Sequence, residues 1–308
     1  MKSEHKKKTA LVLSGGGAKG AFQVGAEKYA RGIKNYEWDV ISGVSVGALN
    51  GAMLAMGKYQ ELFSVWYDIS KDKVLTGGLN IWSILKMVLG AKSIYGNQPL
   101  WELIGEQIDI KRIKVDLTVG AVSLETGAYK RIKIGPSTSA GVKQAEFKKA
   151  ILASTAIPIV WAPVDVSPAN PSMVDGGLRN MSPIGDVLDK NPDEIVIIAC
   201  TSTSEPVYAF ENRNALDIGK HALEIAMNEI FVTDFHQFVR INRMVSDAKK
   251  QANLAIRKQG QQKVYKEYNF KLIEPHPDFP MGKTLDFNSK KSRELMEYGW
   301  ERAKAALG

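Results

Sequence analysis

Residues 11–22 read LVLSGGGAKGAF, and this stretch decides the fold. The residues from Thr9 to Ser14 are typical of a buried strand, three glycines follow, and Ala18 to Ala30 are typical of a helix. Glycine tolerates a positive φ and lets another group approach the backbone closely. The N–H groups of such a turn, backed by a helix N-terminus, favour negative charge. The stretch therefore predicts a strand, an anion-binding turn and a helix, which together form a unit of an α/β fold.

The same turn also fits the G-x-G-x-x-G pattern of dinucleotide-binding proteins, as Gly15, Gly17 and Gly20. That fingerprint expects an acidic residue about 20 positions on, at the end of the second strand. Asp39 has nearly this spacing, but it stands at the start of the predicted strand 39–42. A Walker phosphate loop is excluded because no Gly-Lys-Ser/Thr closes the turn. A nucleotide-binding protein that uses this loop stays as an alternative from another functional class.

Residues 39–54, DVISGVSVGALNGAML, contain a second glycine turn, the G-x-S-x-G pattern from Gly43 to Gly47. It lies between a predicted strand and a predicted helix, which is the context of a nucleophile elbow. The flanking glycines leave room for Ser45 on a sharp turn, and the helix N-terminus would stabilise an oxyanion. A tight Gly/Ser turn without catalysis is the alternative interpretation.

A serine nucleophile needs a base, and the sequence offers two solutions. Ser45, Asp175 and His276 follow the chain order of an α/β-hydrolase triad. That fold places its elbow after several strands, however, whereas Ser45 follows the second, and His276 stands between two prolines, as in a surface loop. Asp175 ends a predicted short strand and precedes Gly176 and Gly177, so it could accept the serine proton directly if burial raises its basicity. A plain turn is the other interpretation of Asp-Gly-Gly.

Composition excludes several classes of protein. The chain has 308 residues, of which 44% are hydrophobic and 24% charged, as in ordinary globular proteins. A single cysteine excludes a disulfide framework, and the four histidines lack the spacing of metal ligands, so no metal is expected. The apolar runs are too short for a membrane span or a signal peptide, so the sequence predicts a cytoplasmic protein.

The net charge of +8 favours an anionic partner. Nucleic acid is not expected, because the chain has no zinc finger, RNP-like pattern or arginine-rich arm. An anionic membrane surface is the remaining candidate. Lys6–Lys8 and the apolar stretch Ile81–Leu89, which has the composition of an interfacial helix, are the residues we expect to meet it. A buried core helix is the alternative interpretation of Ile81–Leu89.

Strands and helices alternate along the chain without a linker or repeat, which predicts one α/β layered domain over residues 1–308. Its core spans about residues 9–203, and C-terminal helices and a returning strand follow to residue 306. The later predicted elements are a hairpin of strands 117–123 and 130–134, strands 173–174, 194–201 and 269–273, and helices 143–153, 216–250 and 289–306.

Three motifs occur in a fixed order: SGGGAKGAF at residues 14–22, GVSVG at 43–47 and VDGGL at 174–178. Together they resemble the patatin-like phospholipase family. The stretch AILASTAIPIVWAPV at residues 150–164 is similar to the segment that precedes the Asp-Gly-Gly turn in that family. The resemblance runs from roughly residue 9 to residue 306. One departure is Ser14, where plant members carry an aspartate.

The resemblance implies a serine lipid acyl hydrolase with a Ser-Asp dyad and no cofactor. Ser45 would be the nucleophile, Asp175 the general base, and the N–H groups of Gly15, Gly16 and Gly17 the oxyanion hole. Lys19 would hold the loop or sense a phosphate headgroup, unless it is simply solvated. The motif glycines that would support these residues are Gly20, Gly43, Gly47, Gly176 and Gly177.

The resemblance also implies a fold and a substrate. The expected fold is a three-layer α/β sandwich with a mainly parallel central sheet and helices on both faces. The expected substrate is a phospholipid or lysophospholipid, cleaved through an acyl-enzyme. A non-lipid carboxylesterase or an acyltransferase is the alternative among enzymes.

Overall fold

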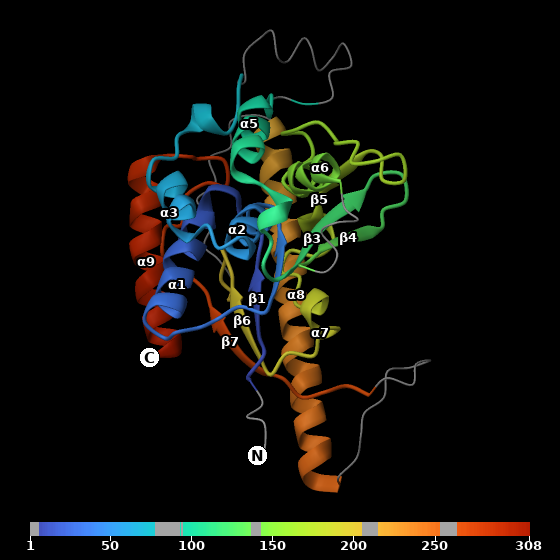
Figure 1. The fold of residues 1–308 in the computed structure, drawn as a ribbon, viewed down its shortest axis with the longest axis vertical. Coiled ribbons are helices and arrows are strands. Elements are labelled where there is room, and N and C mark those ends of the chain that lie inside the picture. The colour runs from blue at the N-terminus through green and yellow to red at the C-terminus, as the bar shows by residue number, and fades with distance from the viewer. Residues whose placement is uncertain (1–5, 78–92, 94, 137–142, 205–214, 253–263) are drawn as a thin grey trace.

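The computed structural model describes residues 6–77, 93, 95–136, 143–204, 215–252 and 264–308 (Figure 1). Its strands are β1 (Thr9–Leu13), β2 (Val40–Val44), β3 (Asp116–Ser123), β4 (Tyr129–Ile134), β5 (Met173–Asp175), β6 (Glu194–Ile198) and β7 (Asn269–Ile273). Its α-helices are α1 (Gly20–Gly32), α2 (Val46–Ala55), α3 (Tyr59–Tyr67), α5 (Gln98–Gln107), α6 (Gln144–Ser154), α7 (Gly185–Leu188), α8 (Ala215–Ala252) and α9 (Ser289–Leu307).

The strands form one mainly parallel sheet in the order β4-β3-β2-β1-β6-β7. The pairs β3–β2, β2–β1, β1–β6 and β6–β7 are parallel. Strands β4 and β5 both run antiparallel to β3, and β4 forms the expected hairpin with it. Because parallel strands end at the same edge, the loops that follow β1 and β2 lie next to each other.

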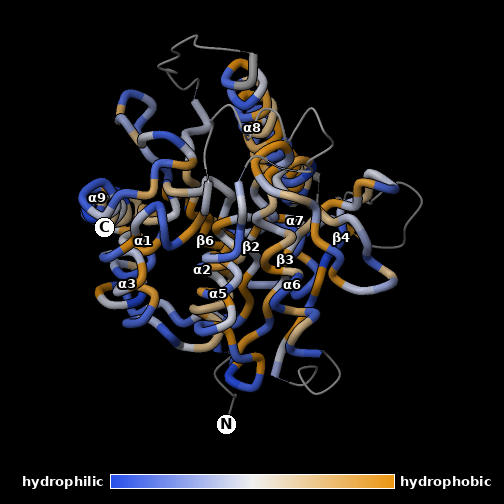
Figure 2. The backbone as a smooth tube through the Cα atoms, turned by 90° about the horizontal axis from the view of Figure 1, so that it is seen from above, coloured by the Kyte–Doolittle hydropathy of each residue, from blue (hydrophilic) through white to orange (hydrophobic). Residues whose placement is uncertain are grey.

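Helices cover both faces of the sheet. Strand β1 requires this, because its residues are all buried and successive side chains of a strand point to opposite faces. Leu11 and Leu13 belong to one buried cluster with residues of α1, α2, α3 and α9. Ala10 and Val12 belong to a second cluster with residues of α7 and α8. In Figure 2 apolar segments gather in the middle of the molecule, whereas the turns of α9 that face the viewer are hydrophilic. The expectation of a three-layer α/β sandwich is therefore confirmed.

Helix α9 packs directly along α1 through two glycines. A Cβ on Gly25 of α1 would clash with the backbone of Met296, and one on Gly299 of α9 would clash with the carbonyl of Phe22. The aromatic ring of Phe22 also lies 5.7 Å from that of Tyr298, measured between centroids. The C-terminal helix therefore covers the first helix of the chain.

Most predicted elements have the expected position. The strand 269–273 has these bounds in the structure, and the predicted helices 216–250 and 289–306 correspond to α8 and α9. The sequence analysis did not predict α3, α5 or α7. The predicted interfacial helix at residues 81–89 lies outside the described residues.

Candidate active site

Ser45 lies at the sharp turn between β2 and α2. Its backbone has φ 55° and ψ −128°, a conformation that residues other than glycine rarely adopt. A Cβ on Gly43 would clash with the carbonyl of Gly47, and one on Gly47 would clash with the carbonyl of Leu13. Both glycines are therefore needed for the chain to turn this tightly against β1. The geometry is that of the predicted elbow, with the side chain of Ser45 at the N-terminus of α2.

Strand β3 brings Asp175 close to Ser45, because the strand that ends just before Ser45 and the strand that ends at Asp175 both pair with β3. In the sheet, Val44 pairs with Gly120, and the next residue of β3, Ala121, pairs with Asp175. Gly176, the next residue, packs closely against β3, because a Cβ on it would clash with the carbonyl of Gly120. Two parts of the chain that are far apart in sequence thus meet at one edge of the sheet.

The carboxyl of Asp175 is fully buried, and burial raises its pKa to about 7. Two smaller influences lower the pKa: the N–H of Gly177, which donates to Oδ1 at 2.7 Å, and the nearby hydroxyl of Ser45. Among the described residues, Oδ2 of Asp175 has no hydrogen-bond partner within bonding geometry. The hydroxyl of Ser45 lies close enough to the carboxyl to lower its pKa. A pKa near 7 suits a general base at neutral pH.

The glycine turn after β1 packs against Ser45, since a Cβ on Gly15 would lie 3.2 Å from the Ser45 Cβ. The N–H of Gly15 donates to the carbonyl of Met181 at 3.0 Å, so it cannot also bind an oxyanion in this conformation. The expectation that the N–H groups of Gly15, Gly16 and Gly17 all form the oxyanion hole is therefore corrected, because that of Gly15 is already bonded. The N–H groups of Gly16 and Gly17 make no hydrogen bond within the described part of the chain. Gly16 has φ 154°, which favours glycine.

Lys19 is buried, at 8% exposure, so it is not a solvated lysine. Its Nζ donates to Oε1 of Glu224 on α8 at 3.1 Å, and the hydroxyl of Thr284 donates to the same oxygen. Burial raises the pKa of Glu224, but the charge of Lys19 and these hydrogen bonds outweigh it, and the pKa is lowered. The carbonyl of Thr284 also accepts the N–H of Ala18 at 2.8 Å. Lys19 therefore holds the glycine turn against α8 and against the segment that contains Thr284.

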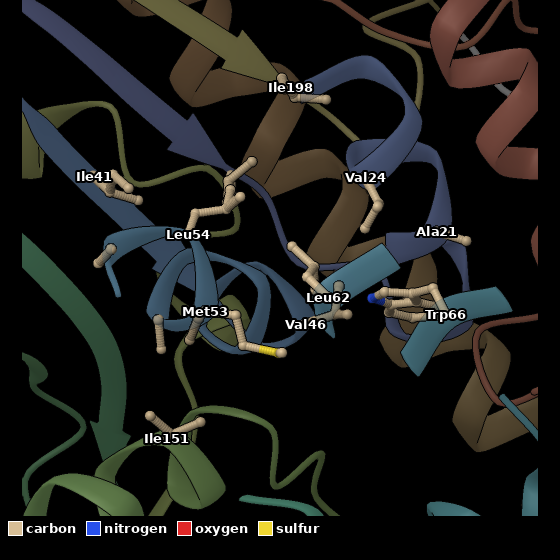
Figure 3. Packing of buried hydrophobic residues seen from close by; sticks show 14 of the residues in the cluster. Ala21, Val24, Ile41, Val46, Met53, Leu54, Leu62, Trp66, Ile151 and Ile198 are labelled. Atoms are coloured by element: carbon tan, nitrogen blue, oxygen red, sulfur yellow. The ribbon is translucent and has the colours of Figure 1, made fainter. Parts of the chain in front are cut away.

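An apolar pocket lies beside Ser45. Its volume is about 730 Å³ with the open mouth included, and Gly17 and Ser45 lie in its wall. The rest of the wall comes mainly from apolar side chains of α2, α3, α5 and the segment after α6, among them Val46, Met53, Leu62, Trp66, Leu103, Ile104, Ile157 and Trp161. Figure 3 shows part of this wall, with Leu62 and Trp66 next to Val46. A long hydrocarbon chain fits the chemistry of such a pocket.

The two residues that supported alternative functions lie elsewhere. The imidazole of His276 is 60% exposed, and its Nδ1 lies 3.4 Å from a carboxylate oxygen of Asp278. The carboxylate of Asp39 accepts the N–H of Thr9 at 2.8 Å, at the start of β1, whereas the glycine turn follows the end of that strand. His276 therefore forms no triad with Ser45 and Asp175, and Asp39 does not lie at the glycine turn.

The N-terminal lysines do not lie beside the pocket. Lys6 pairs with Glu37 at 2.9 Å and Lys7 with Glu194 at 2.7 Å, while the Nζ of Lys8 donates to the carbonyl of Lys190. They precede β1 and so lie at the edge of the sheet opposite to Ser45. In Figure 1 the N-terminus is at the lower end, whereas α5, which lines the pocket, is at the upper end. These lysines therefore lie away from the pocket, and their expected contact with an anionic membrane stays a prediction.

Four residues that sequence analysis did not single out complete the surroundings of the site. They are Ser154, Met181, Glu224 and Thr284, which contact the elbow or the glycine turn. Ser154 lies within the stretch 150–164 that resembles the family, which was a usable signal. The other three come from distant parts of the chain, and no local pattern marks them.

Within the described residues, no group of His, Cys, Asp and Glu side chains could hold a metal ion, and no helix has the length and apolar character to cross a bilayer. The fold and the elbow thus define an α/β protein whose serine faces an apolar pocket. The family model for patatin-like phospholipases matches residues 11–188, more than half of the chain. The chain belongs to the patatin-like phospholipase family, whose members are lipid acyl hydrolases.

No curated protein sequence matches this chain. Among solved structures, the crystal structure of VipD from Legionella pneumophila is similar to 98% of this chain, with a TM-score of 0.49 and 14% sequence identity. The similarity covers 66% of that chain.

Proposed function

We propose that this protein is a serine lipid acyl hydrolase in which Ser45 and Asp175 form the catalytic dyad. One observation carries the proposal: a buried carboxyl with a pKa of about 7 lies beside the elbow serine, and this serine lines an apolar pocket. Membership of the patatin-like phospholipase family supports a lipid substrate. Phospholipids and lysophospholipids are the substrates that we expect, with one acyl chain held in the pocket.

The reaction would proceed in two halves. In the first, Asp175 accepts the hydroxyl proton as the Ser45 oxygen attacks the acyl carbonyl carbon. The oxyanion would be stabilised by the N–H groups of Gly16 and Gly17 and by the N-terminus of α2. The intermediate then collapses, the leaving alcohol takes the proton from Asp175, and the acyl group stays on Ser45. In the second half Asp175 removes a proton from water as the water oxygen attacks the ester carbonyl carbon. When the bond between the acyl carbon and the Ser45 oxygen breaks, Asp175 returns that proton to the serine oxygen, and the fatty acid leaves.

The first test is labelling with a fluorophosphonate, which reacts with activated serines. We expect Ser45 to be labelled, and Ser45→Ala to lose both the label and at least about a thousandfold in kcat. Ser42→Ala is a matched control, because Ser42 is also buried in the turn region but its hydroxyl donates to the carbonyl of Pro183. Labelling of another residue, or activity in folded Ser45→Ala above a tenth of the wild type, would overturn the dyad.

We also propose peripheral contact with an anionic membrane, supported by the net charge of +8. Co-sedimentation with vesicles tests it: the protein should bind anionic vesicles more than zwitterionic ones, and added salt should weaken the binding. Replacing Trp82 and Leu85 by serine should lower turnover on vesicles more than on a soluble short-chain ester. Binding that ignores lipid charge, or an equal loss on both substrates, would argue against this contact.

A further inference from the structure

The hydroxyl of Ser154 joins two backbone groups next to the elbow. Its oxygen accepts the N–H of Ser45 at 2.9 Å and donates to the carbonyl of Gly120 at 2.6 Å. Ser154 is the last residue of α6 and is fully buried. A hydroxyl can donate and accept at once, so this side chain satisfies both groups where water has no access.

The hydrogen bond from the N–H of Ser45 to Ser154 helps to hold Ser45 in a strained backbone conformation. A φ of 55° is strained for serine, and such a conformation persists only where the surroundings hold it. The carbonyl of Ser45 is held from one side, since it accepts the N–H of Ala48 at 2.9 Å in α2. The N–H is held from the other side by Ser154. Both polar backbone groups of Ser45 are thus fixed.

The same turn of chain holds Asp175. The carbonyl of Ala156, two residues after Ser154, accepts the N–H of Asp175 at 3.0 Å. The segment Ser154–Ala156 therefore contacts the backbone of Ser45 at one end and that of Asp175 at the other. A single short segment fixes where Ser45 and Asp175 stand relative to each other.

We propose that Ser154 is a positioning residue for the reaction, whose hydroxyl keeps Ser45 in the conformation that brings its oxygen to Asp175. This inference rests on the proposed function. Ser154 acts through Ser45 and does not line the apolar pocket, whereas its neighbours Thr155 and Ile157 do. Its loss should therefore change the rate of the chemical step and leave acyl-chain binding nearly unchanged.

The experiment compares Ser154→Ala with Ser292→Ala on a soluble chromogenic acyl ester. Ser292 is a matched control because it is also buried and its hydroxyl donates to a backbone carbonyl, that of Trp66. We expect Ser154→Ala to lower kcat at least tenfold with KM within threefold of the wild type. We expect Ser292→Ala to keep kcat within threefold. The rate of fluorophosphonate labelling at Ser45 should fall with kcat.

A pH profile separates positioning from a general loss of stability. The hydroxyl of Ser45 lowers the pKa of Asp175, so a displaced Ser45 should move the acid limb of kcat/KM to higher pH in Ser154→Ala. Ser154→Cys keeps most of the side-chain volume but bonds more weakly, and it should show the same changes. If Ser154→Ala does not fold, the same measurements on Ser154→Cys test the inference.

Three results would overturn the inference: kcat of Ser154→Ala within threefold of the wild type, an equal loss in Ser292→Ala, or an unmoved acid limb. The proposed function fails differently, because wild-type protein would then neither hydrolyse acyl esters nor be labelled at Ser45. If the wild type is active and Ser154→Ala has no effect, the inference about Ser154 fails and the proposed function stands.

Discussion

Burial, more than any neighbouring charge, sets the pKa of Asp175 at about 7, against an ordinary value of 3.8. The folded protein therefore binds this proton more tightly than the unfolded chain does. As pH rises from about 4 to about 7, the unfolded chain gives up the proton first, so this residue lowers the stability of the fold. The loss is complete above pH 7, where the carboxyl is ionised in both states.

Asp175→Asn should separate activity from stability. The amide cannot accept the serine proton, so we expect kcat to fall nearly as far as in Ser45→Ala. Its Oδ1 can still accept the N–H of Gly177, and no buried charge remains. At pH 8 the variant should be more stable than the wild type by roughly 4 kcal/mol at most, and at pH 4 the two should unfold alike.

Urea unfolding at the two pH values measures this difference, together with the pH dependence of kcat/KM. In the wild type kcat/KM should fall as pH drops through about 7. Asp247→Asn, at an exposed site on α8, is the control for the loss of one carboxylate. A less stable Asn variant at pH 8 would mean that the carboxyl is hydrated in solution.

Sequence patterns located the glycine turn, the elbow and Asp175, because each motif is local and its glycines answer a local steric need. The partners of these motifs could not be predicted in the same way. The N–H of Gly15 is taken by Met181 and Lys19 pairs with Glu224, and both contacts depend on how distant segments pack. Charge alone gave no means to distinguish a buried ion pair at Lys19 from a solvated lysine.

At the scale of elements, the regular strands and long helices followed from apolar patterns, whereas the pocket did not. Helix α3 was not predicted, and it buries two of its nine residues, Leu62 and Trp66. Both line the pocket, together with residues of α5, which was also not predicted. A cavity forms where helices fail to fill the space between them, and that property belongs to their packing.

Narrowing this pocket should select against long acyl chains. Leu103 of α5 is half-buried and lines the pocket, so Leu103→Trp should fill part of its volume. We expect kcat/KM for a long-chain ester to fall at least tenfold and that for an acetyl or butyryl ester to change less than threefold. Leu124→Trp, at a side chain 53% exposed, is the control. Equal losses on both esters in Leu103→Trp would place the acyl chain elsewhere.

The ion pair of Lys19 and Glu224 connects the glycine turn to α8. The Lys19 side chain is 9% exposed and that of Glu224 33%, so water screens the pair only in part. Because Thr284 donates to the same carboxylate, three segments meet at one group. The position of the glycine turn is thus coupled to that of α8.

At the scale of the whole molecule, the contact between α1 and α9 makes a prediction that contradicts helix propensity. Alanine normally stabilises an exposed helix position relative to glycine by about 0.5–1 kcal/mol. Gly25→Ala should instead lower the free energy of unfolding by about 1–3 kcal/mol, because its methyl group meets the backbone of Met296.

Gly105→Ala in α5 is the control, since a Cβ there meets no atom within 4 Å, and it should be neutral or stabilising. Denaturant titration of both variants gives the comparison. If Gly25→Ala is the more stable of the two, α9 does not lie against α1 as described.

The close packing of α9 on α1 also bears on how the chain is made. Roughly 250 residues separate the two helices in the sequence. A ribosome adding about 5–20 residues per second needs roughly 13–50 s to produce them. During that interval the face of the first helix that packs against the last helix, around Gly25, lacks that partner, although α2 and α3 have already been made. The newborn protein thus passes through a period in which a chaperone or a neighbouring nascent chain can bind that helix.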